Sequence, residues 1–360
     1  MAQETAQASM LMLARESRGM TQTALARAMS DLAQEPISQG YVSKAEAGRL
    51  AVEGERLTVY ARALGYPRGL LRLDAEVTGI GIGLVHHRKK AALGAHALRR
   101  IHAHLALGRL QTHRLFRALP VDLSLHRFEH IAVNDLDTPT EAAQTLRKLW
   151  EVPAGPITHL VRVIEAAGGL ILVRDLDSRD LDAASQWNHA ERPLFLLGAH
   201  APADRFRFSL AHELGHVIMH PEPGATPQQE RQADEFASEF LMPAADIGGE
   251  LSAGLDLPRL QALKRRWGVS MAALARKALT LAAISEWQYR NLMIEMSTLG
   301  YRTHEPGDIP RELPQTVPAA AQRLVAQHGL DRAAETAGLL AEEFTRLYAP
   351  QPGSPDPTPA

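Results

Sequence analysis

The first seventy-five residues carry apolar positions at the three-to-four-residue spacing of amphipathic helices, interrupted by turn-forming residues. Gly19 stops the first such stretch, Thr21 stands as an N-cap residue before the second, and Gly65 closes the last together with the proline that follows. The pattern predicts helices within residues 11–19, 21–29, 37–50 and 55–67. We therefore expect an all-α unit over residues 1–75.

Beyond residue 152 the pattern of apolar positions becomes mixed. Helical spacing at residues 157–169 and 205–220 flanks two short apolar runs, 170–176 and 193–199, which predict strands. The run at 193–199 fits both an edge strand that pairs with an extended peptide and a strand buried in the core. The whole chain predicts a mostly α fold with a small mixed β-sheet, of the α+β class.

Further changes in pattern suggest where the chain divides after the N-terminal unit. Residues 76–152 predict a basic helical connector, residues 153–310 a mixed domain with a helical extension, and residues 311–348 C-terminal helices. Residues 349–360 are rich in proline and predict a disordered tail.

Composition narrows the class of protein only slightly. The chain has 360 residues and a formal net charge of −2, so bulk charge indicates no particular partner. It contains no cysteine, which excludes disulfides and thiolate metal ligands and fits a reducing compartment. The N-terminus lacks the pattern of a signal peptide, and no apolar run approaches the roughly 20 residues of a membrane helix. We expect a cytoplasmic protein that does not enter a membrane.

One stretch, residues 77–121, has cations and histidines but no acidic residue. Its cations are Arg88, Lys89, Lys90, Arg99, Arg100, Arg109, Arg114 and Arg117, and its histidines are His86, His87, His96, His102, His104 and His113. Such a stretch suits phosphate contacts with a nucleic acid, and it equally suits a solvated spacer between two domains. The histidines have no acidic neighbours in sequence, so we do not expect them to bind a metal.

The strongest chemical signal is the sequence HELGH at residues 212–216. On an α-helix, residues four apart lie on one face, so His212 and His216 can direct their imidazoles at one metal ion. Glu213 lies about 100° round the helix, where its carboxylate reaches a water at the metal. This is the arrangement of zinc hydrolases, in which the glutamate is the general base.

A third ligand is available in the next predicted helix. Glu230 lies fourteen residues beyond His216, and Asp234 shares its helix face, where it can accept an N–H from a metal-bound histidine. Two histidines, a glutamate and an orienting aspartate form a gluzincin-like set. The longer motif with a third histidine ligand fails, because Met219 occupies the position of its glycine. The alternative is a surface helix whose acids are only solvated.

Other roles at this site are less sharply defined. Two imidazoles and a carboxylate suit zinc, which is favoured by affinity, and also manganese. His220 lies one turn beyond His216, and we expect it to pack or to support a ligand in preference to binding the metal. Arg205, His220 and Tyr301 are the candidates for stabilising an oxyanion.

The second and third predicted helices have the order of a helix-turn-helix, in which the later helix enters the major groove of DNA. Hydroxyl, amide and cationic side chains that suit bases and phosphates cluster there. The candidate DNA contacts are Ser38, Gln39, Tyr41, Ser43, Lys44 and Arg49. The alternative is a small helical bundle with no role in DNA binding.

These motifs together resemble a known fusion. Residues 10–71, through TQTALARAM, SQGYVSKAEAGR and ERLTVYARALGYP, resemble the XRE, lambda-repressor-like DNA-binding domain. Residues 155–306 resemble the ImmA/IrrE metallopeptidase family. The matching pieces are RFRFSLAHELGHVIMH, ERQADEFASEFLMP, WGVSMAALARKAL and STLGYRTHEP.

The resemblance implies a zinc site of His212, His216 and Glu230 with Glu213 as general base. It also implies a substrate class, because members of the family cleave helix-turn-helix repressors and so induce stress, mobile-element or phage genes. Two departures stand out. The stretch SDLAQEP (30–36) makes the predicted turn longer than in most repressors, and here the two modules share one chain.

Three hypotheses follow. The first is a transcriptional regulator that binds a double-stranded operator, as a homodimer if the operator is palindromic, and cleaves a helix-turn-helix repressor in trans or itself. The alternative is a non-catalytic transcription factor that uses the peptidase-like domain as a metal- or ligand-binding sensor. The third is a housekeeping peptidase with a degenerate DNA module.

Overall fold

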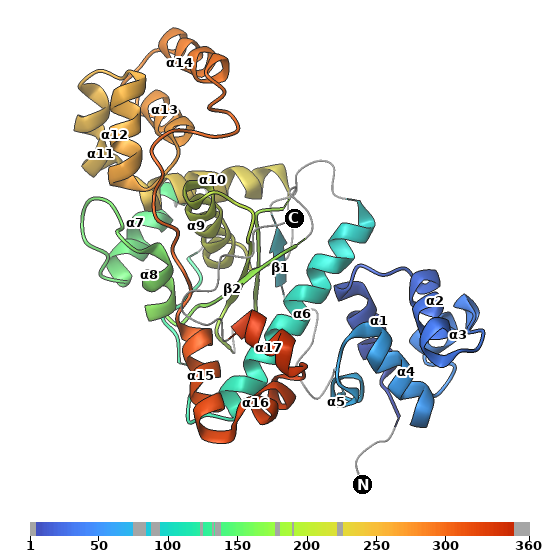
Figure 1. Ribbon diagram of the computed structural model, residues 1–360. Coiled ribbons are helices and arrows are strands. Elements are labelled where there is room, and N and C mark those ends of the chain that lie inside the picture. Colours follow the sequence, from blue (N-terminus) through green and yellow to red (C-terminus); the bar gives the residue numbers. More distant parts are fainter. Residues whose placement is uncertain are drawn as a thin grey trace.

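The computed structural model describes residues 5–74, 84–87, 94–122, 125–131, 133, 138–176, 181–188, 191–221 and 226–348. Among these residues, helices dominate and a single small mixed sheet lies near the centre, which confirms the α+β prediction (Figure 1). The predicted tail at 349–360 and the cations Arg88, Lys89 and Lys90 lie outside the described residues.

The N-terminal unit is all-α, as predicted. Its helices are α1 (Ala8–Ser17), α2 (Gln22–Ala33), α3 (Gln39–Glu46), α4 (Gly54–Leu64) and α5 (Arg68–Leu71). The Thr21 hydroxyl accepts the backbone N–H of Ala24 and caps α2. The expected long turn at 30–36 is wrong, because α2 continues to Ala33 and ends at Gln34 in a left-handed conformation.

The sheet has four strands in the order β1-β3-β4-β2. They are β1 (Leu84–His87), β2 (Leu170–Arg174), β3 (Ala183–Trp187) and β4 (Leu194–Gly198). β2 and β4 run parallel, whereas β3 pairs antiparallel with both β1 and β4. β4 is buried and has a neighbour on each side, so it is a core strand and the edge-strand alternative is wrong.

Alternate residues of the strands supply two separate hydrophobic cores, as the two-residue period of a strand dictates. Leu172 and Leu196 belong to one core, which also contains residues of α6 (Ala95–Arg117). Ile171 and Leu197 belong to the other, which contains residues of α9 (Ala203–Met219). Gly108 lets α6 approach the sheet, since a Cβ there would lie 2.8 Å from a methyl group of Leu172.

The segment expected to be a basic connector contributes elements to this architecture. β1 joins the sheet, and α6 buries much of its length between the sheet and α1. Arg109 of α6 is buried and donates hydrogen bonds to Gln186 and Glu191. α7 (Pro139–Leu149) packs on α10 (Pro227–Leu241), and α8 (Leu160–Ala166) contacts β2.

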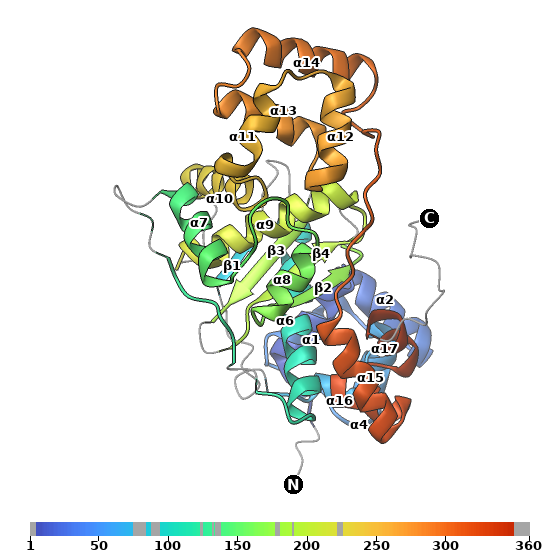
Figure 2. The ribbon, with the colours of Figure 1, turned by 90° about the vertical axis from the view of Figure 1, so that its left-hand side faces the viewer.

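The C-terminal third forms two groups of helices. α11 (Ala244–Ser252), α12 (Leu257–Trp267), α13 (Met271–Thr280) and α14 (Glu286–Thr298) gather at one end of the molecule (Figures 1 and 2). The chain then runs back to α15 (Thr316–His328), α16 (Leu330–Ala337) and α17 (Ala341–Tyr348), beside α6. No described helix has the length and apolar character needed to span a membrane.

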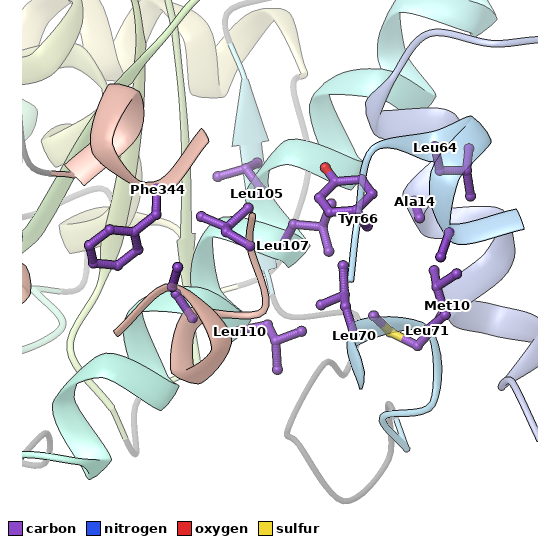
Figure 3. Packing of buried hydrophobic residues seen from close by; sticks show 14 of the residues in the cluster. Met10, Ala14, Leu64, Tyr66, Leu70, Leu71, Leu105, Leu107, Leu110 and Phe344 are labelled. Atoms are coloured by element: carbon purple, nitrogen blue, oxygen red, sulfur yellow. The ribbon is translucent and has the colours of Figure 1, made fainter. Parts of the chain in front are cut away.

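The N-terminal unit is packed against the rest of the chain. Figure 3 shows Leu105 and Leu110 of α6 in one apolar cluster with Leu70 of the N-terminal unit and Phe344 of α17. Beside this cluster, Arg18 forms two hydrogen bonds, of 2.6 and 2.7 Å, with the carboxylate of Glu343. The N-terminal unit therefore shares a core with α6 and the C-terminal helices.

Candidate metal centre and DNA-reading surface

Helix α9 places the first two predicted ligands side by side. His212 and His216 lie one turn apart, and neither is exposed to solvent. Their Nε2 atoms face each other at 3.1 Å. Two imidazole nitrogens at this distance require either a shared proton or a shared cation, since two lone pairs would repel.

Helix α10 brings the third predicted ligand to the same point. A capping box between Thr226 and Gln229 fixes the start of α10, directly before Glu230. The Glu230 carboxylate oxygens lie 3.3 Å from His216 Nε2 and 3.5 Å from His212 Nε2. Gly215 permits this approach of the helices, because a Cβ there would lie only 3.0 Å from the ring of Phe236 on α10.

The three side chains fit a divalent metal. Ligands of a tetrahedral zinc ion, each about 2.0–2.1 Å from the metal, lie about 3.3 Å from one another. The 3.1 Å between the two Nε2 atoms lies around that value, as do the 3.3 and 3.5 Å from these atoms to the two Glu230 oxygens. A buried Glu230 oxygen has no hydrogen-bond partner, and two nitrogens with one carboxylate form a donor set that zinc prefers.

Asp234 lies where the sequence predicted an orienting group. Its carboxylate is 2.8 Å from His212 Nδ1, which directs the Nε2 lone pair of His212 toward Glu230. Burial disfavours a charge on His212, but hydrogen bonds with Asp234 and Glu230 outweigh it and raise the pKa of His212 to about 9. Burial likewise opposes the charge on Glu230, yet both imidazoles hold the pKa of that carboxyl well below its usual range. The cluster therefore favours a positive charge at its centre.

Glu213 points from α9 toward the sheet. One carboxylate oxygen accepts a hydrogen bond of 2.7 Å from the Ser185 hydroxyl on β3, and the other has no partner. Burial raises the pKa of Glu213, against the opposing effect of the two imidazoles. Ser185 was missed in the sequence, because the strand AASQW has no long apolar run and Trp187 is its only strong β-former.

The three candidates for oxyanion stabilisation lie in different surroundings. Both ring nitrogens of His220 are engaged, one with His216 at 2.9 Å and one with Gln232 at 3.1 Å. Burial and the neighbouring His216 lower the pKa of His220 to about 4, so it is neutral. Arg205, in the first turn of α9, pairs with Asp182, and Tyr301 follows α14. None of these contacts identifies an oxyanion-binding group.

The predicted DNA contacts lie on and around α3. Gln39, Lys44 and Arg49 are exposed, whereas Ser43 is half-buried. The Gln39 side-chain amide donates to Gln22 of α2 at 2.7 Å, which links the starts of the two helices. An open cleft of about 570 Å³ lies beside these residues and is also lined by His96 and Arg99 of α6.

Two of the predicted contacts also have structural partners within the N-terminal unit. The Ser38 hydroxyl accepts the backbone N–H of Tyr41 and caps α3. The centroid of the Tyr41 ring lies 6.4 Å from that of Tyr60, and the Arg56 guanidinium lies over the Tyr41 ring, 5.4 Å from its centroid. Ser38 therefore fixes the start of α3 and Tyr41 its packing, in addition to their predicted contacts with DNA.

Comparison with protein families identifies the class of both regions. Residues 11–71 match the family described as helix-turn-helix, and residues 164–279 match the peptidase family described as IrrE N-terminal-like domain. The two matches confirm the resemblance seen in the sequence, to an XRE-type helix-turn-helix domain followed by an IrrE/ImmA-like peptidase domain. A search of curated proteins finds no match to this chain.

Proposed function

We propose that this chain is a DNA-binding transcriptional regulator whose metal-dependent endopeptidase domain cleaves a helix-turn-helix repressor, in trans or itself. The genes controlled would be stress or mobile-element genes, and the protein would act in the cytoplasm. One observation carries the proposal: His212, His216 and Glu230 converge on one point, and Glu213 lies beside them on the same helix. The match to a peptidase family supports it.

The residues have distinct parts in the proposed chemistry. His212, His216 and Glu230 would hold Zn²⁺, or Mn²⁺, and the bound ion supplies Lewis acidity next to a peptide carbonyl. Asp234 orients His212 through the 2.8 Å contact at Nδ1. Glu213 takes a proton from water as general base, and the Ser185 hydroxyl fixes the direction of its carboxylate.

The proposed partner of the N-terminal domain is an operator in double-stranded DNA. α3 would enter the major groove, where Gln39 and Ser43 reach base edges and Lys44 and Arg49 contact phosphates. Ser38 and Tyr41 would set the start and the packing of α3 while lying at the same surface. A palindromic operator would bind the chain as a homodimer.

The substrate class rests on the combination of the two domains. A peptidase domain that shares a core with a DNA-binding domain is brought to promoters, where repressors are bound. The hydrogen bonds between Arg18 and Glu343 fix the two regions against each other, so DNA binding would carry the peptidase with it. A repressor with a helix-turn-helix fold, or a second copy of this chain, is the protein that would be found there.

A census of newly formed protein N-termini, by mass spectrometry, tests this proposal. Cells would express either the wild type or Glu213→Gln, at rest and under stress, and both proteins would be checked for equal metal content. We expect at least one helix-turn-helix protein, or this chain itself, to be cut only by the wild type.

Identical N-termini in the two strains under all conditions would contradict catalysis. The alternative, a transcription factor with a metal- or ligand-binding sensor domain, would then account for the fold. A gel shift with the DNA upstream of the protein's own gene tests the third hypothesis. The catalytic regulator and the non-catalytic sensor should both bind this DNA preferentially, whereas a housekeeping peptidase would show no preference for it.

A further inference from the structure

A chain of hydrogen bonds runs from the second proposed metal ligand to the surface of α10. His220 follows the last turn of α9, and its Nδ1 lies 2.9 Å from Nδ1 of His216. Its Nε2 lies 3.1 Å from the side-chain oxygen of Gln232. His216 is fully buried and His220 is 6% exposed, so water does not replace these contacts.

The far end of this chain determines where each proton lies. An amide oxygen only accepts hydrogen bonds, so Nε2 of His220 carries a hydrogen and donates it to Gln232. In a neutral imidazole the other nitrogen, Nδ1, then has a lone pair and accepts from Nδ1–H of His216. This leaves Nε2 of His216 as its unprotonated nitrogen, facing His212 Nε2 at 3.1 Å and Glu230 at 3.3 Å.

We propose that His220 and Gln232 are positioning residues that hold His216 in the tautomer able to bind the metal. The inference rests on the proposed metal centre and deepens it, because each histidine ligand then has its own orienting group. His212 is oriented by the carboxylate of Asp234 at 2.8 Å, whereas His216 is oriented by a neutral chain that ends at an amide. A nitrogen of His220 is accordingly not a fourth ligand.

The direction of the Gln232 amide is the critical element of this arrangement. A donor at this position would place the lone pair of His220 on Nε2 and its hydrogen on Nδ1. His216 would then accept at Nδ1 and carry its own hydrogen on Nε2, where the metal must bind. An acceptor at residue 232 therefore favours the tautomer of His216 that binds the metal, and a donor there opposes it.

Substitutions at residue 232 test this, with zinc affinity measured by competition against a chromophoric chelator on the full chain. Gln232→Leu removes the acceptor, and we expect its Kd for zinc to rise about 10- to 100-fold. Gln232→Lys supplies only a donor and should bind zinc more weakly than the leucine variant. Gln232→Glu keeps an acceptor and should match or exceed the wild type. Gln228→Leu, exposed on the same helix, is the matched control and should leave the affinity unchanged.

Nuclear magnetic resonance of the ring nitrogens gives a second readout that general damage to the fold would not mimic. In the zinc-loaded wild type we expect the hydrogen on Nδ1 of His216 and on Nε2 of His220. The opposite tautomers, or equal zinc affinity in the leucine, lysine and glutamate variants, would overturn the positioning role while leaving the metal centre intact. A wild type that binds no zinc would overturn the metal centre and this role together.

Discussion

The candidate metal centre and the predicted DNA contacts on α3 differ in how their side chains are satisfied. His212 and His216 have no solvent exposure, and their ring nitrogens contact each other, Glu230, Asp234 and His220. Gln39 and Lys44, by contrast, are exposed on α3, where Gln39 also donates a hydrogen bond to Gln22 of α2. The polar groups of the first site contact one another within the chain, whereas the exposed side chains of the second are accessible to a binding partner.

This difference determines how closely the structure defines the ligand or partner of each site. Buried polar groups must satisfy one another, so the distances within the candidate metal centre restrict what can bind there to a small cation. Exposed side chains satisfy themselves with water, so their positions indicate a class of partner and not a particular operator. The predictions below ask whether the two regions are as independent chemically as this contrast implies.

The largest effect should come from Glu213→Gln. Loss of a general base lowers kcat/KM by about 10²- to 10⁴-fold, because general acid–base catalysis contributes that much. Zinc content and affinity for operator DNA should stay at wild-type values. The value of kcat/KM is measured on the substrate identified by the census of N-termini. A variant that cuts this substrate as fast as the wild type would exclude Glu213 as the general base.

Zinc affinity should depend strongly on pH. The pKa of His212 is about 9 without metal, so zinc must displace a proton at every lower pH. The apparent affinity should therefore rise with pH, about tenfold per unit or about 100-fold between pH 6 and pH 8. Asp234→Asn removes a group that raises this pKa, and its pH dependence should flatten toward pH 8. Affinity that does not change over this range would contradict the electrostatic account.

Substitutions on α3 should weaken DNA binding without changing the metal centre. Gln39→Ala should cost about 1–3 kcal/mol on operator DNA if its amide reads a base, and much less on unrelated DNA. Lys44→Ala should weaken binding to operator DNA and to unrelated DNA by similar amounts. It should also reduce the magnitude of the slope of log affinity against log salt concentration by about 1. Fluorescence anisotropy across a salt series measures both. A loss of zinc in either variant would show that the regions are not independent.

The smallest effect should come from the contact between the N-terminal unit and α17. Glu343→Gln weakens the paired hydrogen bonds with Arg18, which is partly exposed, and should lower the free energy of unfolding by about 1 kcal/mol. Glu342→Gln changes an exposed neighbour and is the control. Thermal unfolding of the full chain measures both. Equal unfolding temperatures for the two variants would mean that this contact does not hold the domains together.

The convergence of the candidate metal ligands was predictable, because its signal is local. The spacing of His212 and His216 on one helix, and of Glu230 and Asp234 on the next, places each pair on one face whatever the rest of the fold. The residues that the sequence did not reveal, Ser185 among them, act across long sequence separations. Gln232 likewise reaches His220 from another helix, and nothing in its neighbourhood along the chain marks it.

The fold was predictable where apolar periodicity was strong and was missed where it was weak. β3 reads AASQW, and β1 lies in a glycine-rich and basic stretch, so neither gave a strand pattern. α2 extends past its apolar stripe and ends at Gln34, where a glycine would have marked the end. The start of α7 was not predicted, although Thr138 and Glu141 form a capping box there.

The most direct test of the central claim is the number of zinc ions bound per chain, measured by native mass spectrometry. We predict one zinc ion in the wild type and in Glu213→Gln, and none in His212→Ala, His216→Ala or Glu230→Ala at equal protein and zinc concentrations. The same result should hold with and without operator DNA. A wild type without zinc, or zinc retained in the ligand variants, would contradict the assignment of a metal centre to these residues.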